Sequence, residues 1–394
     1  MIRSKVDMME ATRLTRQGRL VEALAILRGT ATSTSGSETG YNSESKTQPT
    51  ANERQRTIID MVSPRDSGRL WTAPWGGGRD APSEAPAALF DRLRAPGVTS
   101  GIECLHGYIK SRPQPALPDG ATFRDYSFSN KAGIRTYKLY VPSGYKGQPL
   151  PLIVMLHGCT QSPDDFAAGT RMNELAEEQM FFVAYPAQAQ SANPSKCWNW
   201  FNANEQRRDD GEPSLIAGIT QQIMCDVSVE ARRLYVAGLS AGGALAAVMG
   251  ARYPDLYAAI GVHSGLACGA ASDMPSAFSA MREGAQSVTS THGIPTIVFH
   301  GDADMTVNPI NGDQVIIQAK ARRTLSTTVT TGESEGGVQY TRKVHRDRGG
   351  HALLEQWVMR GIGHAWSGGS SAGSYTEPRG PDASREMVRF FLQS

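Results

Sequence analysis

One pentapeptide of this 394-residue chain has the residue types and spacing for nucleophilic catalysis. Gly238-Leu239-Ser240-Ala241-Gly242 is a G-x-S-x-G sequence that follows an apolar run and opens a helical pattern over 241–252. In such a strand–turn–helix, the glycines relieve crowding and the serine hydroxyl stands at the edge of a sheet. The sequence therefore predicts Ser240 as the nucleophile of an acyl transfer. The alternative is a glycine-rich turn with an ordinary helix-capping serine.

A serine nucleophile needs a base, and that base needs an acid to orient it. In α/β-hydrolases the three residues follow in the order serine, acid, histidine. After the serine, an apolar run at 296–299 leads into Asp302 and Asp304. Asp304 is favoured because the apolar Val307 would hold it inward, whereas Asp302 would brace the turn. His364 follows the last predicted strand in a glycine-flanked loop and is the expected base.

Two backbone amides are expected to form an oxyanion hole. One belongs to Ala241, directly after the predicted nucleophile. The other belongs to Cys159, in the sequence His157-Gly158-Cys159-Thr160 that follows the apolar run 152–156 and has the form of an HG-type oxyanion loop. Losing one such donor costs about 2.7–4 kcal/mol of transition-state stabilisation in acyl-transfer enzymes.

These residues need a sheet that brings them to one edge. Apolar runs predict strands at 126–128, 135–141, 152–156, 181–185, 234–237, 258–263, 296–299 and 354–359. Helical patterns lie between most of them, at 172–179, 214–225, 241–252, 311–322 and 383–392. The first two strands would form a hairpin. The alternation that follows predicts an α/β fold, a mostly parallel sheet with helices on both faces and its site at the carboxyl ends of the strands.

The chain divides into three zones of different composition. Residues 1–29 predict a short helical hairpin, residues 30–118 a disordered or irregular linker rich in small, polar, glycine and proline residues, and residues 119–394 the catalytic domain. A single helical pair cannot form a solenoid by itself. The hypotheses for residues 1–29 are therefore self-association, or contact with a partner or a storage-granule surface.

The composition argues against several other functions. The chain has 40 Lys and Arg against 38 Asp and Glu, so its charge gives no reason to expect nucleic acid or an anionic membrane as a partner. No apolar run is long enough for a membrane span. The charged start, residues 1–7, does not predict a signal peptide, so a cytoplasmic location is expected, with export as the alternative. Five cysteines without zinc-finger spacing predict no metal site.

Six segments together resemble one known family. They are LHGCTQ (156–161), NPSKCWNWF (193–201), YVAGLSAGG (235–243), YPDLYAAIGVHSGL (253–266), HGDAD (300–304) and GIGHAWSGG (361–369). The combination is similar to the polyhydroxybutyrate-depolymerase-like esterases, which neighbour the feruloyl and acetylxylan esterases of carbohydrate esterase family one. The resemblance covers about residues 119–394.

The resemblance implies an α/β-hydrolase fold and hydrolysis of carboxylic esters without a metal or organic cofactor. It carries the nucleophile, acid and base onto Ser240, Asp304 and His364, and the oxyanion donors onto Cys159 and Ala241. The expected substrates are hydroxyalkanoate oligomers or polymer, or small soluble esters. Three alternatives stay open: a feruloyl or acetylxylan-type esterase, a serine peptidase or thioesterase, and a non-catalytic interaction protein with a hydrolase fold.

The resemblance also suggests that Trp198 or Trp200 lines the acyl- or polymer-binding groove. Both follow the predicted strand 181–185 and so lie at the expected catalytic edge. Two tryptophans of the hydrophobic core are the alternative interpretation.

Four of the cysteines can be placed by the strands and helices that precede them. Cys159, Cys197 and Cys268 follow strands and should lie at the catalytic edge, whereas Cys225 ends a helix and belongs at the opposite edge. A Cys159–Cys197 bridge is geometrically possible and is favoured by the resemblance, and a Cys225–Cys268 bridge is not expected. In a reducing cytoplasm, free thiols are the default.

Overall fold

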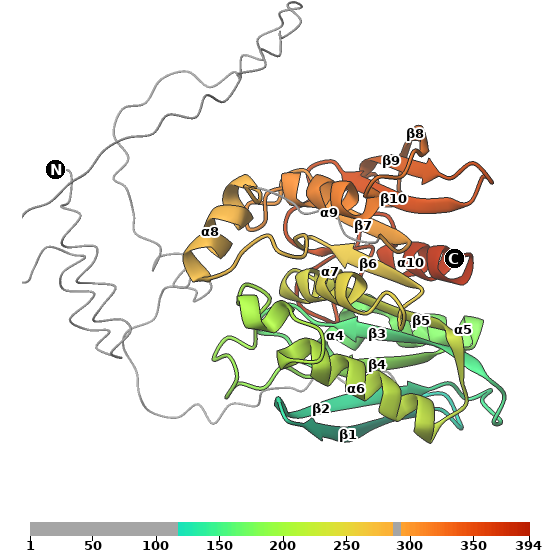
Figure 1. Ribbon diagram of the computed structural model, residues 1–394. Coiled ribbons are helices and arrows are strands. Elements are labelled where there is room, and N and C mark those ends of the chain that lie inside the picture. Colours follow the sequence, from blue (N-terminus) through green and yellow to red (C-terminus); the bar gives the residue numbers. More distant parts are fainter. Residues whose placement is uncertain (1–116, 287–292) are drawn as a thin grey trace, which may run out of the picture. The chain divides into compact units, whose positions relative to one another are not determined.

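The computed structural model describes residues 117–286 and 293–394. The helical hairpin expected at 1–29 and nearly all of the linker expected at 30–118 lie outside these residues. The described part forms a 10-stranded sheet in the order β1-β2-β4-β3-β5-β6-β7-β10-β9-β8, together with helices on both of its faces (Figure 1).

The elements have the following bounds. The sheet contains β1 (Thr122–Asn130), β2 (Gly133–Val141), β3 (Leu150–Leu156), β4 (Phe182–Pro186), β5 (Val229–Leu239), β6 (Ala259–His263), β7 (Thr296–Gly301), β8 (Ser326–Glu333), β9 (Gln339–Arg346) and β10 (Ala352–Met359). A second, two-stranded sheet pairs β11 (Trp366–Ser367) with β12 (Thr376–Glu377). The helices are α4 (Pro163–Thr170), α5 (Met172–Gln179), the 3₁₀ turn η1 (Ala203–Gln206), α6 (Gly211–Asp226), α7 (Ala241–Arg252), α8 (Met274–Glu283), α9 (Ile310–Lys320) and α10 (Ala383–Leu392). Among the described residues, no helix combines the length and apolarity that crossing a membrane requires.

The centre of the large sheet is parallel. Strands β4, β3, β5, β6, β7 and β10 pair in parallel with their neighbours. Antiparallel strands flank them, β2 and β1 beside β4, and β9 and β8 beside β10. Every residue of β3, β4, β6 and β7 is buried, as expected for apolar strands covered on both faces. The predicted fold class is confirmed.

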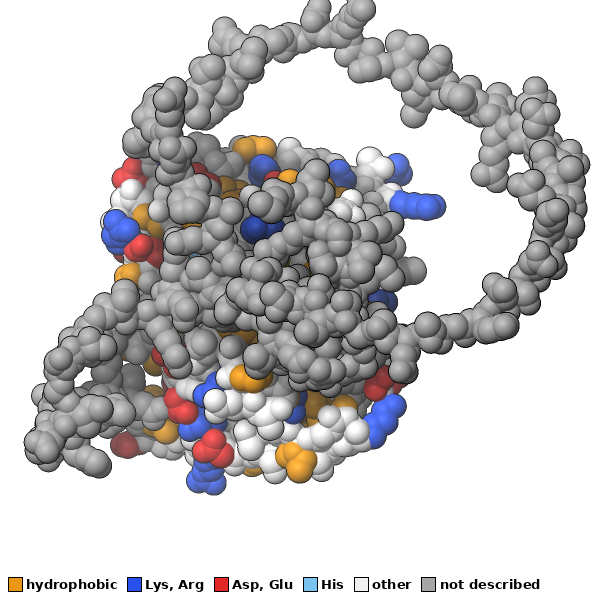
Figure 2. Space-filling model, turned by 90° about the vertical axis from the view of Figure 1, so that its left-hand side faces the viewer, with side chains coloured by type: hydrophobic (Ala, Val, Ile, Leu, Met, Phe, Trp, Pro, Cys, Tyr) orange, Lys and Arg blue, Asp and Glu red, His pale blue; other side chains and the backbone are white. Residues whose placement is uncertain are grey.

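Two hydrophobic cores lie on the two faces of the sheet. Alternate side chains of a strand point to opposite faces: Leu152, Val154 and Leu156 pack into the core covered by α6, α7, α8 and α9, whereas Ile153 and Met155 pack into the core covered by α4, α5 and α10 (Figure 1). On the face shown in Figure 2, acidic and basic side chains of the described residues are interspersed rather than gathered by sign, in keeping with the small net charge.

The strands and helices expected between residues 119 and 394 are all present, and three helices, α5, α7 and α10, have the bounds that the sequence predicts. Seven elements were not predicted: α4, α8, β8, β9 and the short η1, β11 and β12. Every residue of β8 except Gly332 is exposed, so this strand has no apolar alternation to reveal it. Helices α4 and α8 are short, and each begins at a polar cap followed by proline.

Candidate active site

Ser240 lies at the tip of the sharp turn between β5 and α7. Its backbone has φ 57° and ψ −118°, a conformation that residues with a side chain rarely adopt. Its amide donates to the carbonyl of His263 (2.9 Å), whereas its hydroxyl makes no capping bond to α7. The geometry is therefore that of a strained strand-to-helix elbow and not that of an ordinary helix-capping serine.

The glycines of the pentapeptide are required by close packing against β3. A Cβ on Gly242 would collide with the carbonyl oxygen of Leu156, and a Cβ on Gly238 would collide with the backbone of Gly242. These two glycines let the turn after β5 lie directly against the carboxyl end of β3. The serine hydroxyl and the loop after β3 are thereby brought to the same edge of the sheet.

Asp304, which is buried, and His364, which is partly buried, form an acid–histidine pair. Nδ1 of His364 donates to Oδ2 of Asp304 (2.7 Å), and Oδ1 of Asp304 accepts the amides of Thr306 and Val307 (both 2.9 Å). Burial acts to raise the pKa of the Asp304 carboxyl, but hydrogen bonds from His300 and His364 outweigh it and hold this pKa well below its usual range. Asp304 is therefore ionised and fixes the orientation of the His364 ring.

Asp302, the competing aspartate, has a different role. Its side chain is exposed, and Oδ1 accepts the amide of Gly361 (2.6 Å). This bond joins the turn after β7 to the turn after β10, the two turns that carry Asp304 and His364. Asp302 braces these turns, as the sequence predicts, and makes no bond to His364.

Two further histidines, which the sequence did not predict as part of the site, lie there: His300 contacts Asp304, and His263 contacts the Ser240 turn. His300 lies at ion-pair distance from Asp304 (Nε2 to Oδ2, 3.4 Å) and donates to the carbonyl of Val307 (2.8 Å). Its position four residues before Asp304 is the only sequence signal for this contact. His263 is fully buried, stacks on Trp366, and accepts the amide of Ser367 at Nε2 (3.0 Å). Burial holds the pKa of His263 well below its usual range, so its ring stays neutral.

His263 is bonded to the Ser240 turn and lies near the acid–histidine pair. The backbone of His263 accepts the amide of Ser240, and the charges of His364 and Asp304 act on its ring. Within the described residues, no hydrogen bond joins the Ser240 hydroxyl to His364. Catalytic hydrogen bonds are often long in enzymes without substrate and shorten when the substrate binds.

The loop after β3 presents the amide of Cys159. The amides of Cys159 and Ala241 make no hydrogen bond within the described residues, and Ala241 is the first residue of α7, where amides lack intrahelical partners. The amides on either side of Cys159 are engaged, Gly158 with Oε1 of Gln161 (2.9 Å) and Thr160 with the carbonyl of Ser195 (2.7 Å). The loop thus leaves one amide available between two that hold it in place.

A disulfide joins Cys159 to Cys197, so the bridge favoured by the resemblance is present. Cys197 belongs to the long loop between β4 and η1, and the bridge ties this loop to the one after β3. Cys225 and Cys268 are free thiols, the first exposed and the second buried, as expected for a pair that does not bridge.

Trp198 and Trp200 lie in the hydrophobic core. Trp198 has no exposed surface, and Trp200 is 6% exposed. The indole of Trp198 donates to the carbonyl of His157 (3.0 Å) and so helps to hold the loop after β3 in place. A side chain without exposed surface cannot contact a substrate in this conformation. The structure therefore does not support a substrate-binding role for Trp198, and the burial of both matches the alternative interpretation.

A cavity of about 610 Å³ lies where β10 and β8 end and β9 begins, and Asp302 of the turn after β7 contributes to its wall. Polar and apolar groups line it in similar measure, from residues that include Asp302, Thr331, Glu333, Tyr340, Val358 and Arg360. In the part of the chain that the structure describes, no group of three or more His, Cys, Asp or Glu is arranged to hold a metal ion.

Taken together, a strained serine, an acid–histidine pair and two available amides lie at the carboxyl ends of β3, β5, β7 and β10. This is the set of groups that acyl transfer through a serine requires.

The chain is similar in sequence to a family of esterases and to several of its members. The model of the family described as "Esterase PHB depolymerase" matches residues 135–339. Poly(3-hydroxyalkanoate) depolymerase C from Paucimonas lemoignei is 31% identical over 250 residues, 60% of this chain and 59% of that protein. Feruloyl esterase B from Neurospora crassa is 34% identical over 152 residues, 37% of this chain and 50% of that protein. The matched segments thus span between half and three-fifths of these relatives.

Among solved structures, an acetyl xylan esterase from Aspergillus awamori superimposes with a TM-score of 0.53 at 19% sequence identity. The match covers 66% of this chain and 94% of that chain. At this identity the likeness concerns the fold, which is that of an α/β-hydrolase.

Proposed function

Because the chain belongs to the PHB depolymerase family of esterases, we propose that it hydrolyses carboxylic esters through an acyl-enzyme formed on Ser240. The observation that carries the proposal is the 2.7 Å bond between His364 and the ionised Asp304, at the same sheet edge as the strained Ser240 elbow. Family membership gives the reaction class, and these residues give it a mechanism.

In the proposed mechanism the Ser240 hydroxyl oxygen attacks the ester carbonyl carbon while Nε2 of His364 takes the hydroxyl proton. Asp304 keeps the other ring nitrogen protonated and stabilises the imidazolium. The amides of Cys159 and Ala241 bind the oxyanion of the tetrahedral intermediate. His364 then protonates the departing alcohol, and a water molecule, deprotonated by His364, cleaves the acyl-enzyme and releases the acid.

We propose hydroxyalkanoate esters as the substrate, since a poly(3-hydroxyalkanoate) depolymerase is 31% identical to this chain over 250 residues. Esters of sugars are the second candidate, because a feruloyl esterase is 34% identical to this chain over 152 residues.

A substrate panel separates these candidates. Purified protein is assayed on hydroxybutyrate oligomers, acetylated and feruloylated xylo-oligosaccharides, and p-nitrophenyl esters, with matched thioester and amide substrates beside them. We expect oxyester turnover at least 100-fold faster than that of the amides, with hydroxybutyrate oligomers preferred. Faster turnover of the xylo-oligosaccharide esters would favour the second candidate. Turnover of amides or thioesters above that of every oxyester would contradict an esterase assignment.

The disulfide bears on where the protein works. Disulfides persist in oxidising compartments and are rare in the cytoplasm. With Cys159 and Cys197 bridged, we propose that the protein acts outside the reducing cytoplasm, the alternative location of the sequence analysis.

The disulfide also yields a prediction for activity. Replacing Cys159 and Cys197 together by serine frees the loop that presents the Cys159 amide, and we expect kcat to fall about 10-fold with KM little changed, because one oxyanion donor is less well held. The free energy of unfolding should fall by about 2–4 kcal/mol. Cys225→Ser, at an exposed free thiol, is the control and should leave both quantities unaltered. An unchanged kcat in the double variant would show that the bridge is not needed to hold the amide.

A further inference from the structure

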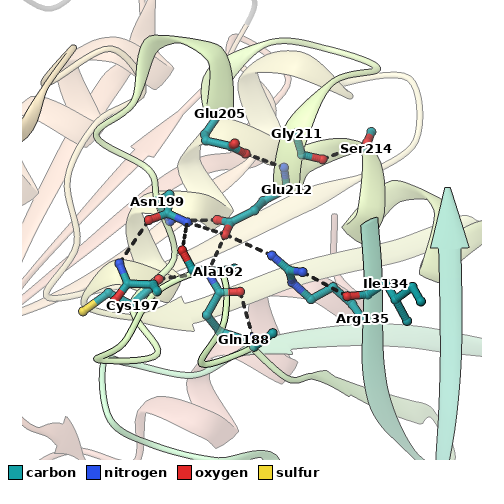
Figure 3. A network of polar contacts seen from close by, with 12 residues as sticks. Ile134, Arg135, Gln188, Ala192, Cys197, Asn199, Glu205, Gly211, Glu212 and Ser214 are labelled. Carbon is teal, nitrogen blue, oxygen red and sulfur yellow. Dashed lines mark hydrogen bonds and ion pairs between the residues drawn. The ribbon is translucent and has the colours of Figure 1, made fainter. Parts of the chain in front are cut away.

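A buried carboxylate lies beneath the long loop that carries Cys197 and Trp198. Glu212 is the second residue of α6 and is 3% exposed. Its side chain points into the loop between β4 and η1, where it lies among Arg135, Gln188 and Asn199 (Figure 3). A carboxylate this deeply buried is retained only when hydrogen bonds compensate for the lost hydration.

Both oxygens of Glu212 are fully engaged. Oε2 accepts the backbone amide of Asn199 (2.7 Å), and Oε1 accepts the side-chain amide of Asn199 (2.9 Å), the guanidinium of Arg135 (3.3 Å) and the side-chain amide of Gln188. Burial raises the pKa of the Glu212 carboxyl, and the hydrogen bonds from Gln188 and Asn199 oppose this rise. The donors thus come from β2 and from both ends of the loop.

Three connections lead from this cluster to the loop after β3. The side-chain amide of Gln188 donates to the carbonyl of Cys197 (2.9 Å), and Cys197 is bridged to Cys159. The backbone amide of Gln188 donates to Nε2 of His157 (3.1 Å). Trp198, next to Asn199, donates to the carbonyl of His157 (3.0 Å). Gln188, which Glu212 holds, therefore contacts His157 directly and Cys159 through Cys197, whereas Asn199 is linked to His157 through its neighbour Trp198.

We propose that Glu212 is a positioning residue for the oxyanion hole: by gathering Gln188, Asn199 and Arg135, it fixes the disulfide-linked loop that holds the Cys159 amide in place. The inference rests on the proposed function, since it requires the Cys159 amide to bind the oxyanion. Glu212 itself touches no reacting atom. Glu212 affects the reaction only by holding this loop, so a variant that loosens the loop should lower kcat by displacing the Cys159 amide.

The competing explanation is that Glu212 and Arg135 only stabilise the fold. The chain offers a matched control for this explanation. Glu355, on β10, has no exposed surface and accepts hydrogen bonds from Arg342 (2.8 Å), Arg389 (2.6 Å) and the indole of Trp357 (2.7 Å). It has a similar number of charged and polar partners, yet none of them contacts the loop after β3.

The experiment compares Glu212→Gln with Glu355→Gln in the full chain. An amide retains one acceptor oxygen, so Glu212→Gln leaves part of the Gln188, Asn199 and Arg135 set without an acceptor. We expect kcat on a p-nitrophenyl ester to fall 10- to 100-fold with KM changed less than threefold. A trifluoromethyl ketone, whose serine adduct carries an oxyanion, should bind more weakly by the same factor as kcat/KM. Glu355→Gln should lower Tm comparably while keeping kcat and ketone affinity within threefold of wild type.

Gln188→Met serves as a second variant in case Glu212→Gln does not fold. It keeps the buried carboxylate and its bond to Arg135 but removes the donor to Glu212 and Cys197, and kcat should again fall about 10-fold. A lower Tm with unchanged kcat and ketone affinity in both loop variants would overturn the positioning role while the wild type remains an active esterase. A wild-type protein that neither hydrolyses esters nor binds the ketone would overturn the proposed function, and this inference with it.

Discussion

Ser240→Ala is expected to abolish ester hydrolysis, with kcat falling by roughly 10⁴- to 10⁶-fold, as in serine hydrolases that lose their nucleophile. The hydroxyl is the one group in the site that can form the acyl-enzyme, so the residual rate would come from the oxyanion donors and substrate binding alone. Initial rates on the best substrate of the panel measure the effect. The acyl-enzyme itself can be followed by mass spectrometry after a pulse of a slowly deacylated ester.

The fold of Ser240→Ala should be unchanged. Alanine carries the same Cβ into the φ 57°, ψ −118° conformation, so the backbone strain is equal in both proteins, and the serine hydroxyl makes no capping bond that could be lost. Tm should therefore stay within about 2 °C of wild type. Ser326→Ala, at the opposite edge of the sheet, is the activity control. Full esterase activity in Ser240→Ala would refute the assignment of the nucleophile.

The second large effect is expected at the acid. Asp304→Asn should lower kcat by about 10⁴-fold, because the asparagine amide can donate to Nδ1 of His364 and then favours the wrong tautomer of the base. The imidazolium also loses the carboxylate that stabilises it. A steady-state comparison of kcat at neutral pH measures the loss, and KM is expected to change little because Asp304 is buried and does not reach the substrate.

Asp302→Asn is the matched control for this prediction. Its retained oxygen can still accept the amide of Gly361, so kcat should stay within about threefold of wild type. The sequence alone leaves two aspartates in competition two residues apart, and this pair of variants decides between them. A loss of activity in Asp302→Asn with an active Asp304→Asn would reverse the assignment.

The parts of the site that could be predicted from the sequence are local or ordered along the chain. The elbow is a contiguous motif, and its strand and helix have strong apolar patterns, so Ser240 could be placed without coordinates. Asp304 and His364 follow from chain order and from the rule that parallel strands end at one edge. The family resemblance, drawn from six short segments, is confirmed by the match over 135–339.

The parts that could not be predicted depend on contacts between distant residues. Glu212 meets Arg135 across 77 positions, and nothing in either local pattern indicates a pair. The burial of Trp198 depends on how a loop without regular structure folds back under His157. Strand β8 is exposed at every residue except Gly332 and is ordered by pairing with β9 rather than by burial of its own side chains.

The position of β10 between β7 and β9 has a consequence for how the protein folds. The elbow and the loop after β3 are synthesised long before His364, and the turn holding His364 is fixed only when β10 has paired in parallel with β7 across the intervening helix and hairpin. Non-local parallel pairing is a slow folding event. In refolding experiments, recovery of esterase activity should therefore lag behind recovery of helical structure. The rate at which activity returns would then report the rate at which β10 pairs with β7.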